Sequence, residues 1–158
     1  MCIRDRYGHA TRFIELAGEI NHRMPRFVVE RVVDALNSKG KAMRGAKILV
    51  LGIAYKPNVD DIRETPAAEV ITLLMDRGGE ISYHDPHVPE FPSMRKYEIK
   101  LSSRELTADE VRRSDCIVII TDHEAIDWRL VNENASLIVD TRDAMARAGY
   151  SGTHIFKA

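Results

Sequence analysis

The sequence has few of the residues that mark a secreted, membrane-bound or metal-binding protein. It holds two cysteines and one tryptophan among 158 residues, and aromatic residues make up only 6%. Two cysteines fit neither a disulfide framework nor a zinc pattern, so we expect a protein of the reducing cytoplasm. No apolar run approaches the roughly twenty residues that a membrane-spanning helix needs.

An excess of charge of one sign is also lacking. The 23 Lys and Arg residues nearly balance the 24 Asp and Glu residues, which gives a formal net charge of −1. This balance predicts neither a nucleic acid nor an anionic membrane surface as a partner. The hydrophobic fraction of 44% and the charged fraction of 30% are typical of a soluble globular protein with a single packed core.

A long amphipathic helix is predicted for residues 11–40. Apolar residues recur every three or four positions and form one stripe along it. Pro25 interrupts the pattern, because proline removes a hydrogen bond to the carbonyl four residues earlier, and Gly40 fits the end of the helix. The stripe has two interpretations: packing of the helix on its own domain, or pairing of the helix with a second copy in a dimer.

After this helix, short apolar runs alternate with helical patterns. Alternation of this kind predicts an α/β fold: a doubly wound, mainly parallel Rossmann-like sheet, preceded by the long N-terminal helix. Residues from about 144 onward carry little pattern. The expected strands are 47–53, 80–84, 98–101, 115–121 and 136–140, and the expected helices are 66–77, 107–112 and 126–132.

The most informative segment is residues 47–69, KILVLGIAYKPNVDDIRETPAAE. A buried strand leads into a charged loop, and Thr65 and Pro66 then fit the N-cap and first position of a helix. In an open α/β sheet, ligands bind at the loops that leave the carboxyl ends of strands. Lys56 and Arg63 in this loop therefore predict an anionic ligand, most simply a phosphate; the alternative is a pair of solvated cations.

A second guanidinium is expected at the same edge of the sheet. Arg142 follows the last predicted strand, in LIVDTRD, and would face the same crevice as Lys56. The carboxylates of the first loop are interpreted as an ion-pair network that fixes its shape rather than as catalytic acids. These carboxylates are Asp60, Asp61 and Glu64.

A cluster of metal-ligand types, His84, Asp85 and His87, follows the second predicted strand. Its segment is rich in proline and shows no fourth ligand, so we predict no metal there. Two roles remain open for Asp85: it could orient part of a nucleotide or close a turn.

Three segments resemble the nucleotide-sugar dehydrogenases, the UDP-glucose/UDP-N-acetylhexosamine 6-dehydrogenase family. GIAYKPNVDDIRETP resembles the family's G-x-A-[FY]-K-x-x-x-x-D-x-R-E-[ST]-P segment. FIELAGEINHRMP resembles the start of its long central helix, and YHDPHVPEFP resembles the segment after the second strand of its C-terminal domain. The likeness covers about residues 10–143. The family's NAD-binding domain and catalytic cysteine would lie before residue 10, so we expect no catalytic residue in this chain.

The resemblance implies a role for each cation. The family's matching lysine contacts the UDP-sugar, so Lys56 would be a substrate-binding residue. The arginine before E-[ST]-P contacts NAD held by the other domain, so Arg63 would be a cofactor-binding residue. Arg142 matches an arginine that contacts the UDP moiety. The family's central helix forms dimers, so the implied partners are a UDP-sugar and a second copy of the chain, bound through residues 11–40, with no nucleic acid and no membrane.

On this resemblance the chain is the C-terminal portion of an NAD-dependent UDP-sugar 6-dehydrogenase and is inactive alone. The expected substrate is UDP-N-acetylglucosamine or UDP-N-acetylmannosamine, oxidised from the C6 alcohol to the uronic acid. NAD would be bound mainly by the N-terminal domain. Gly52 is the single glycine where an NAD site shows G-x-G-x-x-G, which favours UDP over NAD as the ligand of this domain.

Two other functions remain open for the chain. A stand-alone nucleotide-binding or dimerisation module without catalysis is the main alternative. A receiver-like signalling domain would need a phosphoacceptor Asp at the end of the first strand, where Gly52 and Ile53 stand.

The expected division of the chain has four parts. They are residues 1–9, an artefact or disordered; 10–41, a central dimerisation helix; 46–143, a UDP-binding α/β domain; and 144–158, a tail.

Overall fold

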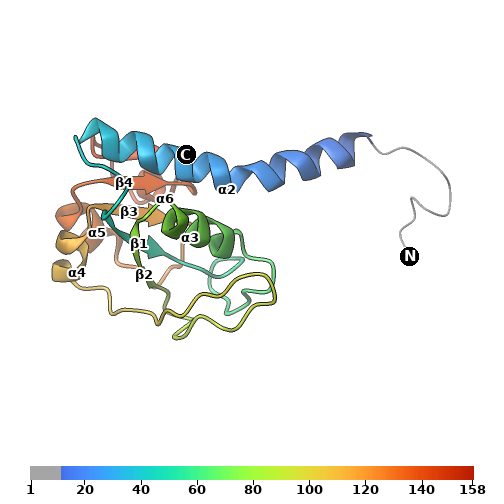
Figure 1. Cartoon of the computed structure of the whole chain (residues 1–158). Helices are drawn as coiled ribbons and strands as arrows, with labels where there is room; N and C mark the ends of the chain where they lie inside the picture. The colour runs from blue at the N-terminus through green and yellow to red at the C-terminus, as the bar shows by residue number, and fades with distance from the viewer. Residues whose placement is uncertain (1–11) are drawn as a thin grey trace.

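The computed structural model describes residues 12–158, which form one long helix followed by a five-stranded α/β sheet (Figure 1). The expectations for residues 1–9, and for the helix before Arg12, lie outside the described residues. The helices are α2 (Arg12–Ser38), α3 (Pro66–Asp76), α4 (Ala108–Arg113), α5 (Trp128–Asn134) and α6 (Ala144–Arg147). The strands are β1 (Lys47–Leu51), β2 (Glu80–His84), β3 (Cys116–Ile119), β4 (Ile138–Asp140) and β5 (Ile155–Lys157).

The five strands are all parallel and lie in the order β2-β1-β3-β4-β5. The chain moves outward from β1 to β2, then crosses back to β3 on the other side of β1. In doubly wound sheets, ligands bind at the carboxyl ends of the strands where the order reverses, which here is between β1 and β3. The predicted α/β Rossmann-like fold with a long N-terminal helix is confirmed.

Alternate residues of β1 pack into two separate cores, one on each face of the sheet. Ile48 and Val50 join the core that contains the buried residues of α2 and α3. Leu49 and Leu51 join the core that contains those of α4, α5 and α6. The unbroken apolar run of β1 therefore reflects a strand covered on both faces, as parallel sheets require.

Helix α2 is divided into a buried inner half and an exposed outer half, which extends beyond the sheet in Figure 1. The inner half buries Val29, Val32 and Leu36 completely, whereas Phe13 in the outer half is 89% exposed. The helix continues through Pro25 and ends at Ser38, and Gly40, with φ +70°, lies in the turn that follows. Among residues 12–158, none of the helices has the length and hydropathy of a transmembrane span.

The predicted strand at 98–101 is wrong. These residues lie in the connection between β2 and α4, which folds back on itself: the Phe91 N–H donates to the Leu101 carbonyl at 3.0 Å. Only isolated bridges form nearby, including one between Tyr83 and Ser103. Ile99 is buried, so its apolar character reflects burial in this connection and not a place in the sheet.

Residues 144–158 contain two elements that the sequence pattern did not predict, α6 and β5. Strand β5 extends the sheet by pairing with β4, with Ile155 opposite Ile138. Arg31 of α2 also holds β5, because its guanidinium donates to the Lys157 carbonyl at 3.2 Å and 3.3 Å. Both elements are short and depend on contacts with distant parts of the chain.

Gly52, directly after β1, is required both by its backbone and by its surroundings. It has φ +73°, and a Cβ atom there would lie 2.1 Å from the carbonyl oxygen of Thr121. The end of β1 thus touches the segment that follows β3, and no side chain fits between them.

We predict that Gly52→Ala destabilises the protein far more than Gly40→Ala. Gly40 has a similar φ of +70° but open space around it, so alanine there should cost only about 1 kcal/mol for the backbone conformation. Gly52→Ala should add about 2 kcal/mol or more, because the Thr121 backbone must move. Urea denaturation of both variants checks this; equal losses would show that the Thr121 contact is unimportant.

Candidate functional site

A cationic hollow of about 490 Å³ lies at the carboxyl ends of β1, β3 and β4. The loop after β1 contributes Lys56, and the segment after β4 contributes Arg142, so the structure brings these two predicted residues to one site. Both are exposed. The lining residues are Tyr55, Lys56, Pro57, Pro66, Asp122, Arg142 and Arg147.

The Arg142 guanidinium is oriented by the neighbouring strand. Its Nε–H donates to the Ile120 carbonyl at 2.7 Å, and its backbone N–H donates to Asp140 Oδ1 at 2.9 Å. Asp140, which is buried, also accepts the Met145 N–H at 2.9 Å, so its carboxylate fixes the turn into α6. The terminal nitrogens of Arg142 form no hydrogen bond within residues 12–158, which leaves them available to an anion.

The other charges of the hollow leave it net positive. Arg147 forms an ion pair with Asp122 and donates a hydrogen bond to the Arg142 carbonyl at 3.2 Å. The Lys56 ammonium lies 5.8 Å from the centroid of the Tyr55 ring and forms no ion pair in the described part of the chain, although its charge contributes to the lowered pKa of Asp61. Lys56 and Arg142 therefore carry the uncompensated charge.

Arg63 lies in the same loop as Lys56 but does not line the hollow. Its Nε and Nη2 atoms are both 3.0 Å from the carboxylate oxygens of Asp61, which also accepts the Arg63 backbone N–H. These hydrogen bonds, the side-chain ones foremost, lower the pKa of Asp61 to about 2. Asp60 and Glu64 form no ion pair within the described residues, so the predicted network is a single pair.

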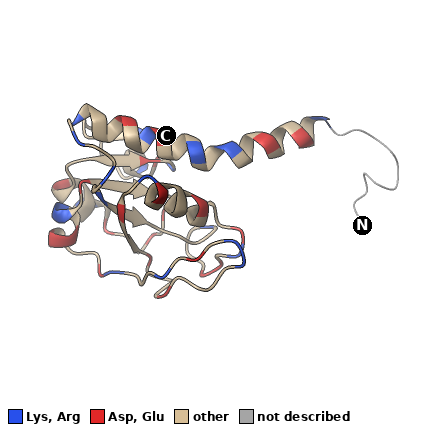
Figure 2. Cartoon of the chain, viewed as in Figure 1, with Lys and Arg blue, Asp and Glu red and all other residues tan. Residues whose placement is uncertain are grey.

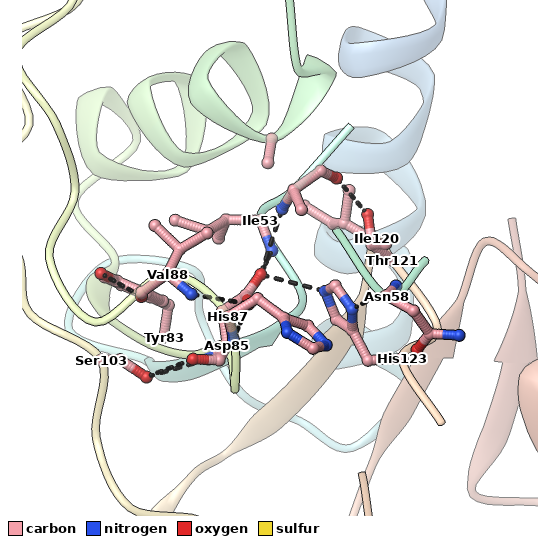
Figure 3. Close-up of polar contacts among 12 residues, drawn as sticks. Ile53, Asn58, Tyr83, Asp85, His87, Val88, Ser103, Ile120, Thr121 and His123 are labelled. Atoms are coloured by element: carbon pink, nitrogen blue, oxygen red, sulfur yellow. Dashed lines mark hydrogen bonds and ion pairs between the residues drawn. The ribbon is translucent and has the colours of Figure 1, made fainter. Parts of the chain in front are cut away.

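A buried carboxylate, Asp85, connects the segments that follow β1, β2 and β3 (Figure 3). Its Oδ2 accepts the backbone N–H groups of Ile53 at 2.7 Å and Ala54 at 3.1 Å, directly after β1. Its Oδ1 accepts those of His87 at 2.8 Å and Val88 at 3.1 Å. Of the two roles left open for Asp85, the structure shows the closing of a turn, and it adds a tie to β1.

His123, which no sequence pattern singled out, is completely buried after β3. Its Nε2 lies 3.1 Å from Asp85 Oδ2, and its Nδ1 accepts the Asn58 N–H at 2.9 Å. Asn58 has a left-handed backbone with φ 62°, and its Oδ1 accepts the Glu124 N–H at 2.9 Å. A histidine in the segment that leaves a buried strand at the reversal of strand order was the available signal.

The hydrogen bonds on Asp85 outweigh the effect of its burial on ionisation. Burial alone would raise its pKa, but the bonds from His123 and from the backbone of Ile53 and His87 lower it to about 2. The carboxylate is therefore ionised across the physiological range and cannot act as an acid or base there.

The histidines near Asp85 do not form a metal site. His84 Nδ1 forms a hydrogen bond with the Arg104 carbonyl at 2.7 Å. The His87 ring instead packs against the His123 ring, with ring centroids 4.9 Å apart. No group of three His, Cys, Asp or Glu residues in the 12–158 range is placed to hold a metal. Burial also raises the pKa of the Cys116 thiol to about 12, so this cysteine is not a nucleophile.

We predict that Asp85→Asn lowers stability by about 3 kcal/mol at pH 7, because an amide NH₂ would face backbone N–H groups left without an acceptor. The carboxylate pKa falls from 3.8 to about 2 on folding, so its stabilisation is present above pH 3.8 and is lost as the pH falls through 2. Urea denaturation at several pH values should show the difference from wild type shrinking over that interval. Asp61→Asn, at a half-exposed site where solvent screens the pair with Arg63, should change stability little. A pH-independent Asp85→Asn effect would contradict this account.

Comparison with known proteins identifies the family. The model of the UDP-glucose/GDP-mannose dehydrogenase family, UDP binding domain, matches residues 49–147. A UDP-N-acetyl-D-mannosamine dehydrogenase of Methanococcus maripaludis is 41% identical over 115 residues, which are 72% of this chain and 24% of that protein. A UDP-glucose 6-dehydrogenase of Rhizobium meliloti is 31% identical over 149 residues, 88% of this chain and 33% of that protein.

A solved structure shares the fold. The UDP-D-ManNAc dehydrogenase from Pyrococcus horikoshii matches with a TM-score of 0.76 at 24% identity. The match covers 98% of this chain and 35% of that protein's chain. The chain thus spans about a quarter to a third of the length of these relatives. The residues matched by the family model include every residue that lines the cationic hollow. The resemblance is confirmed, and the chain belongs to the UDP-glucose/GDP-mannose dehydrogenase family.

Proposed function

We propose that the cationic hollow binds the diphosphate of a UDP-sugar and that the chain is the C-terminal UDP-sugar-binding portion of an NAD-dependent UDP-sugar 6-dehydrogenase. The observation that carries this proposal is the pair Lys56 and Arg142, both without a carboxylate partner in the described residues, on one hollow at the reversal of strand order. Membership of the family supports the same ligand.

The chemistry of the two side chains suits a diphosphate. The terminal nitrogens of Arg142 form a planar fork that can bond two phosphate oxygens, and its direction is set by the bond from Nε to Ile120. The Lys56 ammonium supplies a point charge from the opposite loop. A hollow of about 490 Å³ has room for a nucleotide in part, with the sugar extending beyond it.

NAD does not fit the turn after β1. In a dinucleotide site the backbone N–H groups of this turn face the phosphates. Here Asp85 already accepts the N–H groups of Ile53 and Ala54, and its negative charge would repel a phosphate. Arg63, exposed outside the hollow, is proposed to contact NAD held by another part of the intact protein.

The proposed role in the reaction is to anchor the UDP end of the substrate. Binding energy gained far from the reacting carbon can hold C6 in position for oxidation from the alcohol to the uronic acid. The names of the relatives favour UDP-N-acetylmannosamine over UDP-N-acetylglucosamine. The groups that carry out the oxidation, and NAD, would come from the rest of the intact protein, which we place in the cytoplasm.

We predict that Lys56→Ala and Arg142→Ala each weaken UDP binding about tenfold, because each removes a charge-assisted contact worth about 1.5 kcal/mol. Isothermal titration calorimetry with UDP checks this. Arg63→Ala is the matched control, since it removes a cation of the same loop outside the hollow and should leave UDP affinity unchanged.

Two results would count against the proposal. Wild-type affinity for UDP in both alanine variants would mean that the nucleotide binds elsewhere. NADH formation from a UDP-sugar by the purified chain would contradict the assignment of the chemistry to the rest of the protein. UDP binding without turnover agrees with this proposal and also with a stand-alone binding module. NAD-dependent oxidation of a UDP-sugar by the intact gene product would distinguish the two.

We also propose that the chain forms a homodimer through the outer half of α2. The apolar strip on this half-helix is exposed, and an exposed apolar stripe of this length is typical of a helix with a partner. Between residues 13 and 27 its two acidic residues lie before its two arginines (Figure 2), so two antiparallel copies of this stretch would place opposite charges together. The apolar strip comprises Phe13, Leu16, Ile20, Met24 and Phe27.

We predict that Leu16→Glu combined with Ile20→Glu converts the dimer into a monomer, because two carboxylates would be buried in the middle of the paired strips. Sedimentation velocity measures the oligomeric state. Asn37→Glu, an exposed substitution on the same helix outside the apolar strip, should leave the dimer intact. A wild-type chain that sediments as a monomer at high micromolar concentration would rule out this interface.

A further inference from the structure

Asn58 ties the loop that carries Lys56 to the segment after β3, on the far side of Lys56 from the bond that Ala54 accepts from the Thr121 hydroxyl at 2.6 Å. Lys56 and Pro57 are exposed. The Asn58 backbone N–H donates to His123 Nδ1 at 2.9 Å, and its side-chain Oδ1 accepts the Glu124 N–H at 2.9 Å. Both bonds connect the loop after β1 to the segment after β3, across the reversal of strand order.

The hydrogen bonds around His123 define its tautomer. A backbone N–H can only donate, so His123 Nδ1, which faces the Asn58 N–H, must be unprotonated. The ring hydrogen of the neutral imidazole is then on Nε2, where it donates to Asp85 Oδ2 at 3.1 Å. An ionised Asp85, itself held by the Ile53 and Ala54 N–H groups, accepts from the ring and so fixes which nitrogen is free.

We propose that His123 is a positioning residue for the nucleotide site: it accepts the Asn58 N–H and thereby holds the loop that presents Lys56 to the anion. Asp85 acts one step further back, by keeping His123 in the tautomer that can accept. This inference rests on the proposed binding of UDP in the cationic hollow.

Two features distinguish this arrangement from ordinary packing. His123 is a completely buried polar residue that must offer an acceptor on one side and a donor on the other, which an apolar residue of the same volume cannot do. Asn58 holds φ 62°, which costs energy for a residue with a side chain, and it uses both its backbone and its side chain to bind the segment after β3. The tie is therefore made by groups whose chemistry is specific.

Loss of the tie is expected to weaken UDP binding without removing any contact to UDP. A free loop must be ordered again each time Lys56 binds a phosphate, and this ordering reduces the affinity. The effect should therefore be smaller than that of Lys56→Ala, which removes the cation itself.

Two substitutions of His123 separate its two bonds. An asparagine oxygen lies at the same number of bonds from Cβ as His Nδ1, so His123→Asn keeps an acceptor for the Asn58 N–H and loses the donor to Asp85. A glutamine nitrogen corresponds to His Nε2, so His123→Gln keeps the donor to Asp85 and loses the acceptor. A purely structural role would make the two variants differ in stability alone.

We predict that His123→Gln raises the UDP dissociation constant about threefold to fivefold, whereas His123→Asn leaves it within about twofold of wild type. Calorimetry on the full chain measures both, together with urea denaturation. Equal affinities in the two variants, or a greater loss in His123→Asn, would overturn the proposal. If a buried variant fails to fold, Asn58→Gly offers a test on the surface. It removes the side-chain bond to Glu124 at a position where the backbone favours glycine. It should also weaken UDP binding, and wild-type affinity would count against the tie.

A measurement that needs no ligand keeps this inference separate from the proposed function. Amide hydrogen exchange by NMR should show the Asn58 N–H protected in wild type and in His123→Asn, and exchanging faster in His123→Gln. Long-range proton–nitrogen spectra should show the His123 hydrogen on Nε2. If wild type fails to bind UDP while these signatures hold, the proposed function is wrong and the tie is real; if the Asn58 amide exchanges equally in all three proteins, the tie is wrong.

Discussion

One buried carboxylate joins the ends of three strands. Asp85, after β2, accepts N–H groups that follow β1 and the ring hydrogen of His123, which follows β3. A carboxylate removed from water costs several kcal/mol unless hydrogen bonds replace its hydration. The fold therefore requires the loops at the reversal of strand order to converge on this one group, and their shape follows from that requirement.

The same carboxylate determines how the domain can hold an anion. Since Asp85 uses the backbone N–H groups nearest the end of β1, a phosphate cannot bind there as it does in a dinucleotide site. Positive charge is supplied further out, by side chains. The other two arginines of the region are each paired with an aspartate, so Lys56 and Arg142 remain as local positive charge in a chain whose formal net charge is −1.

Features that depend on neighbouring residues were predictable from the sequence, and features that depend on distant contacts were not. The buried runs of β1 and β3, the N-cap of α3 at Thr65 and the turn at Gly40 after α2 all have local causes. Lys56 and Arg142 could be placed together because the carboxyl ends of parallel strands share one edge. The pairing of His123 with Asp85 joins residues 38 apart in sequence, and β5 has only three residues and depends on β4 for its place.

The contact between Arg31 and the end of β5 has a consequence for shortened versions of the chain. An open edge of a sheet presents unpaired carbonyls to which a strand of another molecule can add, and such addition leads to aggregation. Here the guanidinium of α2 occupies the Lys157 carbonyl on that edge. A domain trimmed back to β1 would lose this protection, and the apolar surface that α2 covers would be exposed to water. The inner half of α2 therefore belongs to the smallest unit that can be handled in solution.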